Sequence, residues 1–361
     1  MTISSRPGGP ADTASTLAAA AAGDDAAFAA VTERHRRELL VHCYRMLGSL
    51  DDAEDAVQEA LLKAWRGLPG YEGRSTLRAW LYRIATNVCL DAFDHRARRV
   101  LPAAIAAAAD PRLPPAPDDD EIAWLQPYPD ILLEVADPDP ATDPAIAAVR
   151  REHIELAFVA AIQFLPPRRR AVLLLRDVLG FTAVETATMT GTSPASVNNA
   201  LLRARAGLAA RRPAAGADAT PPAVRDELVR SYLDAWHAAD VPALVALLCE
   251  DADMSMPPTP SWDHGRDRVG IYLRRLFAGP WGHGLRLVPT AANRQPALAV
   301  YAPAGGRTGY EPFAIKVLNI HNGLISAVTG FVHPGLFRHF GLPAEPDLHG
   351  PADGNNVVGV A

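Results

Sequence analysis

Cysteine is scarce in this chain of 361 residues, which contains only Cys43, Cys89 and Cys249. The three are far apart, and no CxxC or Cys/His ligand spacing occurs, so the sequence predicts neither a disulfide framework nor a zinc site. A run of about 18 apolar residues that could span a membrane is also missing. The N-terminus lacks the basic segment and apolar stretch of a signal peptide. We therefore expect a cytoplasmic protein with no metal, no cofactor and no membrane partner.

Charge is unevenly distributed, although the net charge is only -6. Residues 101–144 carry ten acidic side chains and one arginine, which gives -9, whereas residues 145–213 carry ten arginines and four acidic side chains, which gives +6. The 32 prolines cluster at 102–144, 213–222 and 257–260, which indicates linkers. A basic domain beside an acidic linker indicates an anionic partner, but a solvated linker beside an ordinary arginine-rich helix pair explains the charges equally well.

The hydrophobic pattern divides the chain into several parts and predicts a multidomain protein. Two parts have helical periodicity throughout, and a third mixes helices with runs of Val, Ile and aromatic residues, so we expect two all-α domains and one α+β domain. The expected boundaries are 1–23 for a disordered N-terminus, 24–100 and 145–213 for the helical domains, 101–144 for the linker with a short helix near Ile131–Val135, 224–343 for the α+β domain, and 344–361 for a flexible tail.

Within 24–100 the spacing predicts three helices. In the second helix the apolar residues Ala53, Val57 and Leu61 fall on one face, and the acidic and amide side chains fall on the opposite face. Acidic residues near a helix N-terminus are favoured by the helix dipole, so capping and solvation alone would account for them. In the third helix Trp80 falls on the inner stripe with Ile84 and Val88, and we expect it in the core.

The basic part predicts a helix-turn-helix. Thr182–Met189 is typical of a first helix, Gly191 suits the turn, and Ser193 and Pro194 are typical of the N-cap and first position of a second helix. The apolar stripe of that second helix would pack inward. This leaves a polar face for the major groove of DNA, made of Ser193, Ser196, Asn198, Asn199, Arg203 and Arg205. An ordinary helical hairpin with an arginine-rich solvent face is the alternative.

The α+β part begins with two expected helices, at 224–239 and 241–249. Strand-like runs follow at Ala297–Tyr301, Phe313–Ile320 and Leu324–Phe331. Between the last two runs stands His321-Asn322-Gly323, which predicts a hairpin turn.

Two blocks of residues resemble the extracytoplasmic-function (ECF) sigma factors of bacterial RNA polymerase. The first runs from Cys43-Tyr44-Arg45-Met46-Leu47-Gly48 through Asp52-Ala53-Glu54-Asp55-Ala56-Val57-Gln58-Glu59 to Leu77-Arg78-Ala79-Trp80-Leu81-Tyr82-Arg83-Ile84-Ala85-Thr86-Asn87, and is similar to sigma region 2. The second runs from Leu165-Pro166-Pro167-Arg168 to Arg205 and is similar to sigma region 4.

The resemblance implies a set of contacts for these residues. Asp52, Glu54, Asp55, Gln58 and Glu59 would bind the clamp helices of the largest polymerase subunit. The minus-10 promoter element would be contacted by Arg83, Asn87, Asp91, His95, Arg96, Arg98 and Arg99, and the minus-35 element by the helix-turn-helix. Sigma factors pass the segment between the two regions through the polymerase, and the aromatic cluster at Trp124–Asp130 suggests a docking motif within it.

The C-terminal part resembles the SnoaL-like branch of the cone-shaped NTF2-like fold. The resemblance rests on Tyr232-Leu233-Asp234-Ala235-Trp236, on Met256-Pro257-Pro258 and on the ending from Asn322-Gly323 to Leu342-Pro343. It implies a half-apolar pocket for a small-molecule ligand, with the candidate lining residues Trp236, Trp262, Tyr272, Phe277, Trp281, Phe313 and His333. Enzymes of this fold use an Asp/His pair for proton transfer, for which Asp253, Asp263, His264 and His333 are candidates.

These features favour a sigma factor that is not an enzyme, in which the C-terminal domain is a built-in regulator. The alternatives are a SnoaL-like isomerase or hydrolase fused to a DNA-binding module, and an ordinary repressor-type binding module. The Asp52–Glu59 helix and the Trp80 helix distinguish the sigma factor from both, because neither alternative needs them.

Overall fold

The structure is a computed structural model, and it describes residues 10–93, 97–133, 153–211, 220–279, 284–305 and 309–346. It divides into two compact units. One contains Met1–Ala97, Val135–His153 and Ala161–Arg211, and the other contains Arg98–Glu134, Ile154–Ala160 and Arg212–Ala361.

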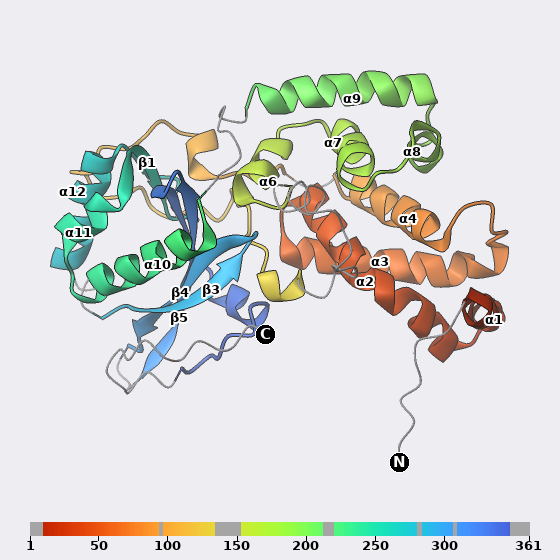
Figure 1. Cartoon of the computed structure of the whole chain (residues 1–361), viewed down its shortest axis with the longest axis horizontal. Helices are drawn as coiled ribbons and strands as arrows, with labels where there is room; N and C mark the ends of the chain where they lie inside the picture. Colours follow the sequence, from red (N-terminus) through yellow and green to blue (C-terminus); the bar gives the residue numbers. More distant parts are fainter. Residues whose placement is uncertain are drawn as a thin grey trace, which may run out of the picture. The chain divides into compact units, whose positions relative to one another are not determined.

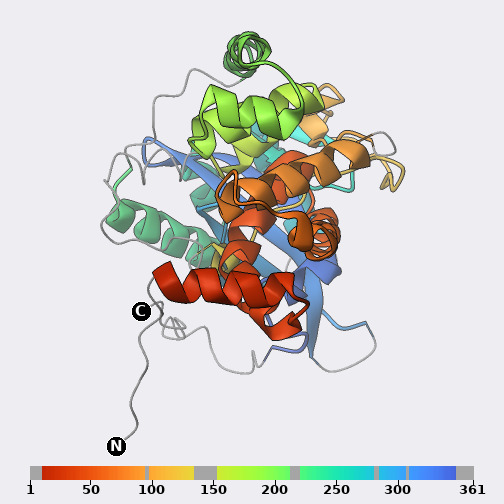
Figure 2. The same cartoon turned by 90° about the vertical axis from the view of Figure 1, so that its right-hand side faces the viewer.

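The first unit begins with four helices, which are α1 (Pro10–Ala21), α2 (Asp25–Leu47), α3 (Leu50–Gly67) and α4 (Leu77–Ala92). Asp24, Ser49 and Thr76 cap the last three by accepting backbone N–H groups, which satisfies donors that a helix start leaves open. Helix α1, drawn in red, packs against α2 (Figure 2). The expectation that 1–23 is disordered is therefore wrong for Pro10–Ala21, because an alanine-rich segment has high helix propensity once a neighbouring helix buries one face.

The same unit contains the helix-turn-helix. It comprises α7 (Pro167–Leu173), the π-helical turn η4 (Leu174–Val178), α8 (Ala183–Thr190) and α9 (Pro194–Ala209), and follows α6 (Leu156–Ile162). Figure 1 shows the long helix α9 with α7 and α8 beneath it.

Arg170 joins the two halves of the first unit. Only 2% of this residue is exposed, and its guanidinium donates hydrogen bonds to the carbonyl oxygen of Met46 in α2 and to the side chain and backbone of Gln163. A second contact packs the rings of Tyr82 and Phe181 edge to face, with centroids 5.4 Å apart. The first helices and the helix-turn-helix thus share one packed interior.

The second unit is built on one six-stranded sheet with the order β2-β1-β6-β5-β4-β3. The strands are β1 (Leu248–Ser255), β2 (Trp262–His264), β3 (Arg286–Ala292), β4 (Gln295–Pro303), β5 (Tyr310–His321) and β6 (Leu324–Phe331). All neighbouring pairs are antiparallel except β1 and β6. The helices are α10 (Pro222–His237), α11 (Val241–Ala246) and α12 (Arg266–Ala278).

The three helices and the inner face of the sheet enclose one hydrophobic core. The expected hairpin is confirmed, with Asn322 and Gly323 at φ values of 51° and 75° between β5 and β6. The expected helix over 241–249 ends at Ala246, and β1 begins at Leu248. The α+β domain that the sequence predicted is therefore present.

The connecting segment, which we define as residues 98–133, packs on this α+β domain. It has little regular structure, with short 3-10 turns at η2 (Pro102–Ala104) and η3 (Asp130–Leu132), so the expected short helix near Ile131–Val135 is reduced to η3 within the described residues. Its backbone exchanges hydrogen bonds with the domain instead: Ala109 N–H donates to the carbonyl of Trp262 over 2.8 Å, and the indole N–H of Trp262 donates to the carbonyl of Ala106 over 2.9 Å.

Candidate functional site

Helix α9 presents an exposed face that is mostly polar and includes one large apolar side chain, Leu202, which is 69% exposed. Local signals in the sequence determine the start of this helix. Ser193 is the N-cap and accepts the N–H of Ser196, Pro194 is the first residue, and Gly191 turns the chain at a φ of 65°. Val197, Leu201 and Ala204 are buried. The six residues predicted to contact the minus-35 element are all exposed, namely Ser193, Ser196, Asn198, Asn199, Arg203 and Arg205.

The two arginines of this face differ in their surroundings. Arg205 donates from Nε and Nη2 to both carboxylate oxygens of Asp177, over 2.9 and 2.7 Å. Among the described residues, no hydrogen-bond or ion-pair partner of Arg203 is found. The carboxylate of Asp177 offsets the positive charge of Arg205. Arg203 is therefore the stronger candidate for a phosphate contact.

The predicted minus-10 residues fall into three groups. Arg83, Asn87 and Asp91 are exposed on α4, and Asp91 lies 3.8 Å from the ammonium of Lys63. His95 and Arg96 lie outside the described residues. Arg98 is exposed, whereas Arg99 donates to the carbonyl of Trp124 over 2.9 Å within the connecting segment.

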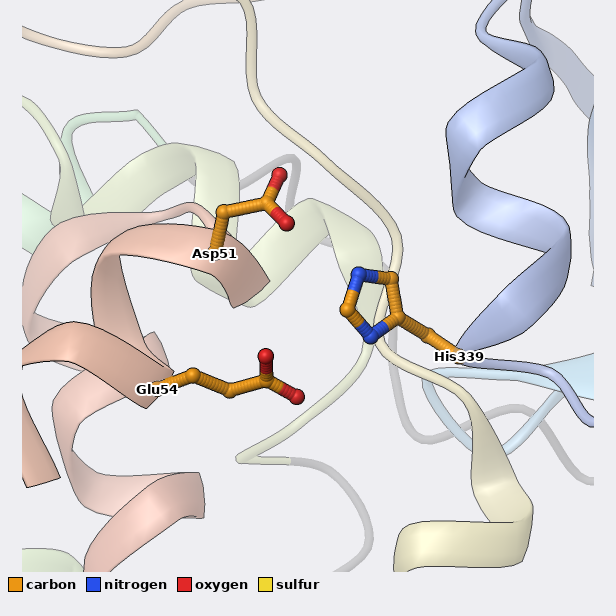
Figure 3. Close-up of side chains that lie close together, drawn as sticks. All are labelled: Asp51, Glu54 and His339. Carbon is orange, nitrogen blue, oxygen red and sulfur yellow. The ribbon is translucent and has the colours of Figure 1, made fainter. Parts of the chain in front are cut away.

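The start of α3 carries the predicted polymerase-binding residues. Glu54, Asp55, Gln58 and Glu59 are exposed and Asp52 is half-buried, while Ala53, Ala56, Val57 and Ala60 are buried on the opposite face. Figure 3 shows Glu54 and its neighbour Asp51 extending from the first turns of this helix. Trp80 is 8% exposed and packs against Tyr71, which confirms it as a core residue.

Comparison with known proteins identifies both helical regions. Residues 31–99 match the family Sigma-70 region 2, and residues 155–208 match Sigma-70 region 4. The chain is 43% identical over 319 residues to the ECF RNA polymerase sigma factor SigG of Mycobacterium tuberculosis, covering 88% of this chain and 84% of SigG. The chain belongs to the ECF family of RNA polymerase sigma factors.

A second relative extends the likeness to the fold of the whole chain. The ECF sigma factor SigJ of Mycobacterium tuberculosis is 26% identical over 318 residues, which cover 84% of this chain and 91% of SigJ. The crystal structure of SigJ superposes with a TM-score of 0.56 over 86% of this chain and 97% of that one, at 23% identity. Sigma factors bind core RNA polymerase and promoter DNA and act as initiation factors rather than enzymes. No described helix of this sigma factor is long and apolar enough to cross a membrane.

The pocket residues predicted for the C-terminal domain of the sigma factor divide into inner and outer ones. Trp236 and Phe277 are buried with ring centroids 5.0 Å apart, and Tyr272 and Phe313 pack against the same core. His333 is exposed, directly before η5 (Pro334–Arg338). Trp262 is half-buried and bonds the connecting segment through its indole N–H. Trp281 lies outside the described residues.

The expected proton-transfer pair exists in part. His264 Nδ1 lies 2.7 Å from Asp253 Oδ1, because the two residues face each other across β1 and β2. Their side chains are 55% and 44% exposed. Burial of Asp263 raises the pKa of its carboxyl, but no hydrogen-bond partner of its Oδ1 is found among the described residues. An exposed pair of this kind resembles a surface ion pair more than an enclosed acid–base site.

Two buried polar residues of the C-terminal domain, Asn293 and Lys316, were not predicted from the sequence. Asn293 begins the two-residue turn between β3 and β4 and is fully buried, with a φ of 57°. Its side chain accepts the N–H of Tyr128 and donates to the carbonyl of Ile154, each over 2.8 Å. Lys316 is a 4% exposed lysine in the middle of β5. A lysine inside the apolar run Phe313–Ile320 was the signal that could have identified it.

Proposed function

We propose that this sigma factor directs core polymerase to promoters through three exposed surfaces, and that its C-terminal domain regulates it by binding the connecting segment. The polar face of α9 would contact the minus-35 element, the exposed residues of α4 the minus-10 element, and the acidic face of α3 the polymerase clamp helices. These assignments are supported by exposure of the polar residues opposite buried apolar faces on each helix. We further propose that it acts in the cytoplasm, where polymerase and promoters are found.

The regulatory proposal rests on Asn293. One side chain bonds the backbone of Tyr128 at the end of the connecting segment and the backbone of Ile154 near the start of region 4. Its own N–H also donates to the carbonyl of Tyr128 over 2.8 Å. Two neighbouring residues reinforce the contact: Arg294 N–H donates to Asp130 Oδ1 over 2.8 Å, and Gln295 Oε1 accepts Leu156 N–H over 2.9 Å.

Helix α12 and the loop between β1 and β2 also bind the connecting segment. Arg275 donates to the carbonyls of Pro111, over 2.7 Å, and of Leu113. Thr259 donates its hydroxyl proton to the carboxylate of Asp118 over 2.6 Å. Hydrogen bonds of this kind contribute about 0.5–1.5 kcal/mol each, so together they are strong enough to order the segment.

Run-off transcription with purified core polymerase tests the regulatory role with Asn293→Ala. Asn322→Ala is the matched control, because it also places alanine at a positive φ in a two-residue turn, between β5 and β6. We expect Asn293→Ala to change transcript yield by about fivefold or more, in line with a coupling of 1–3 kcal/mol, and to expose residues 98–133 to protease. If the two variants transcribe equally, the regulatory role is wrong.

Reversing the charge of Asp55 and Glu59 to lysine tests the polymerase surface. We expect weaker binding to core polymerase with an unchanged circular dichroism spectrum, because both side chains are exposed. Unchanged binding would show that this face of α3 is only solvated.

A further inference from the structure

The C-terminal domain has a buried lysine, Lys316, in the middle of strand β5. Of the 35 basic residues in the chain, only Lys63 and Lys316 are lysines. Lys63 is half exposed and lies within 3.6 Å of Glu59 and 3.8 Å of Asp91. Lys316 is 4% exposed and stands between Ala314 and Leu318, which both belong to the core under the helices. Because side chains alternate along a strand, Lys316 shares their inner face.

The ammonium of Lys316 lacks a counter-ion. Its Nζ lies 3.5 Å from the centroid of the Trp236 ring, a cation–π contact, and no carboxylate within ion-pair distance is found among the described residues. Burial alone lowers the pKa of Lys316 to about 7, and neither Asp263 nor the tyrosines Tyr232 and Tyr272 contribute to that shift. A buried lysine without a partner is destabilising unless something else neutralises or solvates it.

Two further donors on α10 lack acceptors. The indole N–H of Trp236 and the hydroxyl of Tyr232 are buried, and neither has a hydrogen-bond partner among the described residues. The two rings stack with centroids 6.1 Å apart. An unsatisfied buried donor costs about 1–3 kcal/mol, so these two donors, one of them on the ring that Lys316 contacts, indicate an absent group that is rich in acceptors.

The surroundings restrict that group further. Leu273, Phe277 and Leu318 line the same core, so its body must be apolar. Beside Lys316 stands Gly330, and a Cβ built there would meet Met256 Sδ at 2.3 Å and Lys316 Cγ at 3.5 Å. The flexible Met256 side chain therefore occupies space next to the lysine, and rotation of its thioether would make room for a ligand.

We propose that the interior of the C-terminal domain binds a small apolar carboxylic acid, whose carboxylate pairs with Lys316 and whose hydrocarbon body lies among the core side chains of α10 and α12. The carboxylate supplies both the missing negative charge and the missing acceptors. The proposal names a ligand class for the regulatory domain, and it rests on the proposed function only for its effect on transcription.

Lysine NMR on the full-length chain provides a direct test. Labelling with ¹³Cε-lysine gives two side-chain signals, which Lys316→Met and Lys63→Met assign. The probes are linear carboxylates from butanoate to decanoate and phenylacetate, each compared with the corresponding alcohol. We expect at least one acid to raise the pKa of Lys316 by about one unit or more, leaving that of Lys63 unchanged, because the bound anion favours the ammonium.

Affinity provides the second measurement. At pH 6 the same acid should bind about tenfold or more tightly than its alcohol. At pH 8 the acid should bind about tenfold more weakly than it does at pH 6, because Lys316 is mostly deprotonated at the higher pH. Lys316→Met, with Lys316→Gln as the alternative if the first variant does not fold, should abolish the preference for acid over alcohol. If no acid in the series moves the pKa of Lys316, or if alcohols bind equally well, the proposal is wrong. Acid binding without any change in transcription would instead contradict the regulatory role alone.

Discussion

At the scale of single residues, Arg203 and Arg205 are both exposed on α9 but differ in their partners. Both leave the apolar stripe of α9, and the pattern could not separate them, because the partner of Arg205 is Asp177, 28 residues earlier. Arg203→Ala should weaken binding to promoter DNA and lower the slope of log K against log salt by about 0.9. Arg205→Ala should have a smaller effect, because part of its binding energy is spent on leaving Asp177. Filter binding between 50 and 200 mM salt measures both, and an equal or larger loss for Arg205→Ala would contradict this order.

His42 makes the stability of region 2 dependent on pH. It is fully buried and its Nε2 lies 2.9 Å from Thr86 Oγ1. Burial, with smaller contributions from Arg45 and Arg78, lowers its pKa from 6.5 to about 3. The unfolded chain therefore binds the extra proton between those values, and stability is present above pH 6.5 and is lost as the pH falls toward 3.

Urea unfolding of the wild type and of His42→Gln measures this effect. Between pH 7 and pH 5 the histidine should lower the free energy of unfolding by about 2 kcal/mol relative to the variant, which does not titrate. Identical pH dependence in both proteins would show that His42 is not buried in its neutral form.

At the scale of elements, the turn of the helix-turn-helix depends on one glycine. Gly191 has a φ of 65°, and a Cβ there would meet nothing within 4 Å, so the backbone conformation alone selects glycine. Gly191→Ala should destabilise the first unit by about 1 kcal/mol. Gly70→Ala is the control, because it has the same open surroundings without a positive φ. Thermal unfolding should show a lower Tm only for the first variant, and equal Tm values would rule out the strain.

The elements that could be predicted from sequence are those with local signals. The N-cap Ser193, the turn at Gly191 and the Asn322-Gly323 hairpin each act within a few residues. Strand β1 (Leu248–Ser255) was missed because its exposed Glu250 and Asp251 interrupt the apolar alternation. The binding of the connecting segment could not be predicted either, because Asn293 meets Tyr128 across 165 residues of sequence.

At the scale of the molecule, Arg170 couples regions 2 and 4. Arg170→Met removes its bonds to Met46 and Gln163 and should lower the free energy of unfolding by about 3 kcal/mol. We expect the single urea transition of the first unit to become two, because the regions lose one of the polar contacts that join them, while Gln163 still donates to the carbonyl of Arg45. Arg168→Met, at an exposed position two residues earlier, is the control. A single, unshifted transition in Arg170→Met would show that the remaining contacts are enough to join the regions.

The bonds of Asn293 bring together two distant points of the chain that links region 2 to region 4. Its amide holds Tyr128 and Ile154 next to each other, although they are 26 residues apart in sequence. A chain of 26 residues can extend to about 86–94 Å. While Asn293, Arg294 and Gln295 hold both ends of this length, it would add nothing to the tether between region 2 and region 4. Release of this turn together with the Arg170 contact would therefore lengthen the tether in a single step, and reach along the promoter would change as a switch rather than as a gradual stretch.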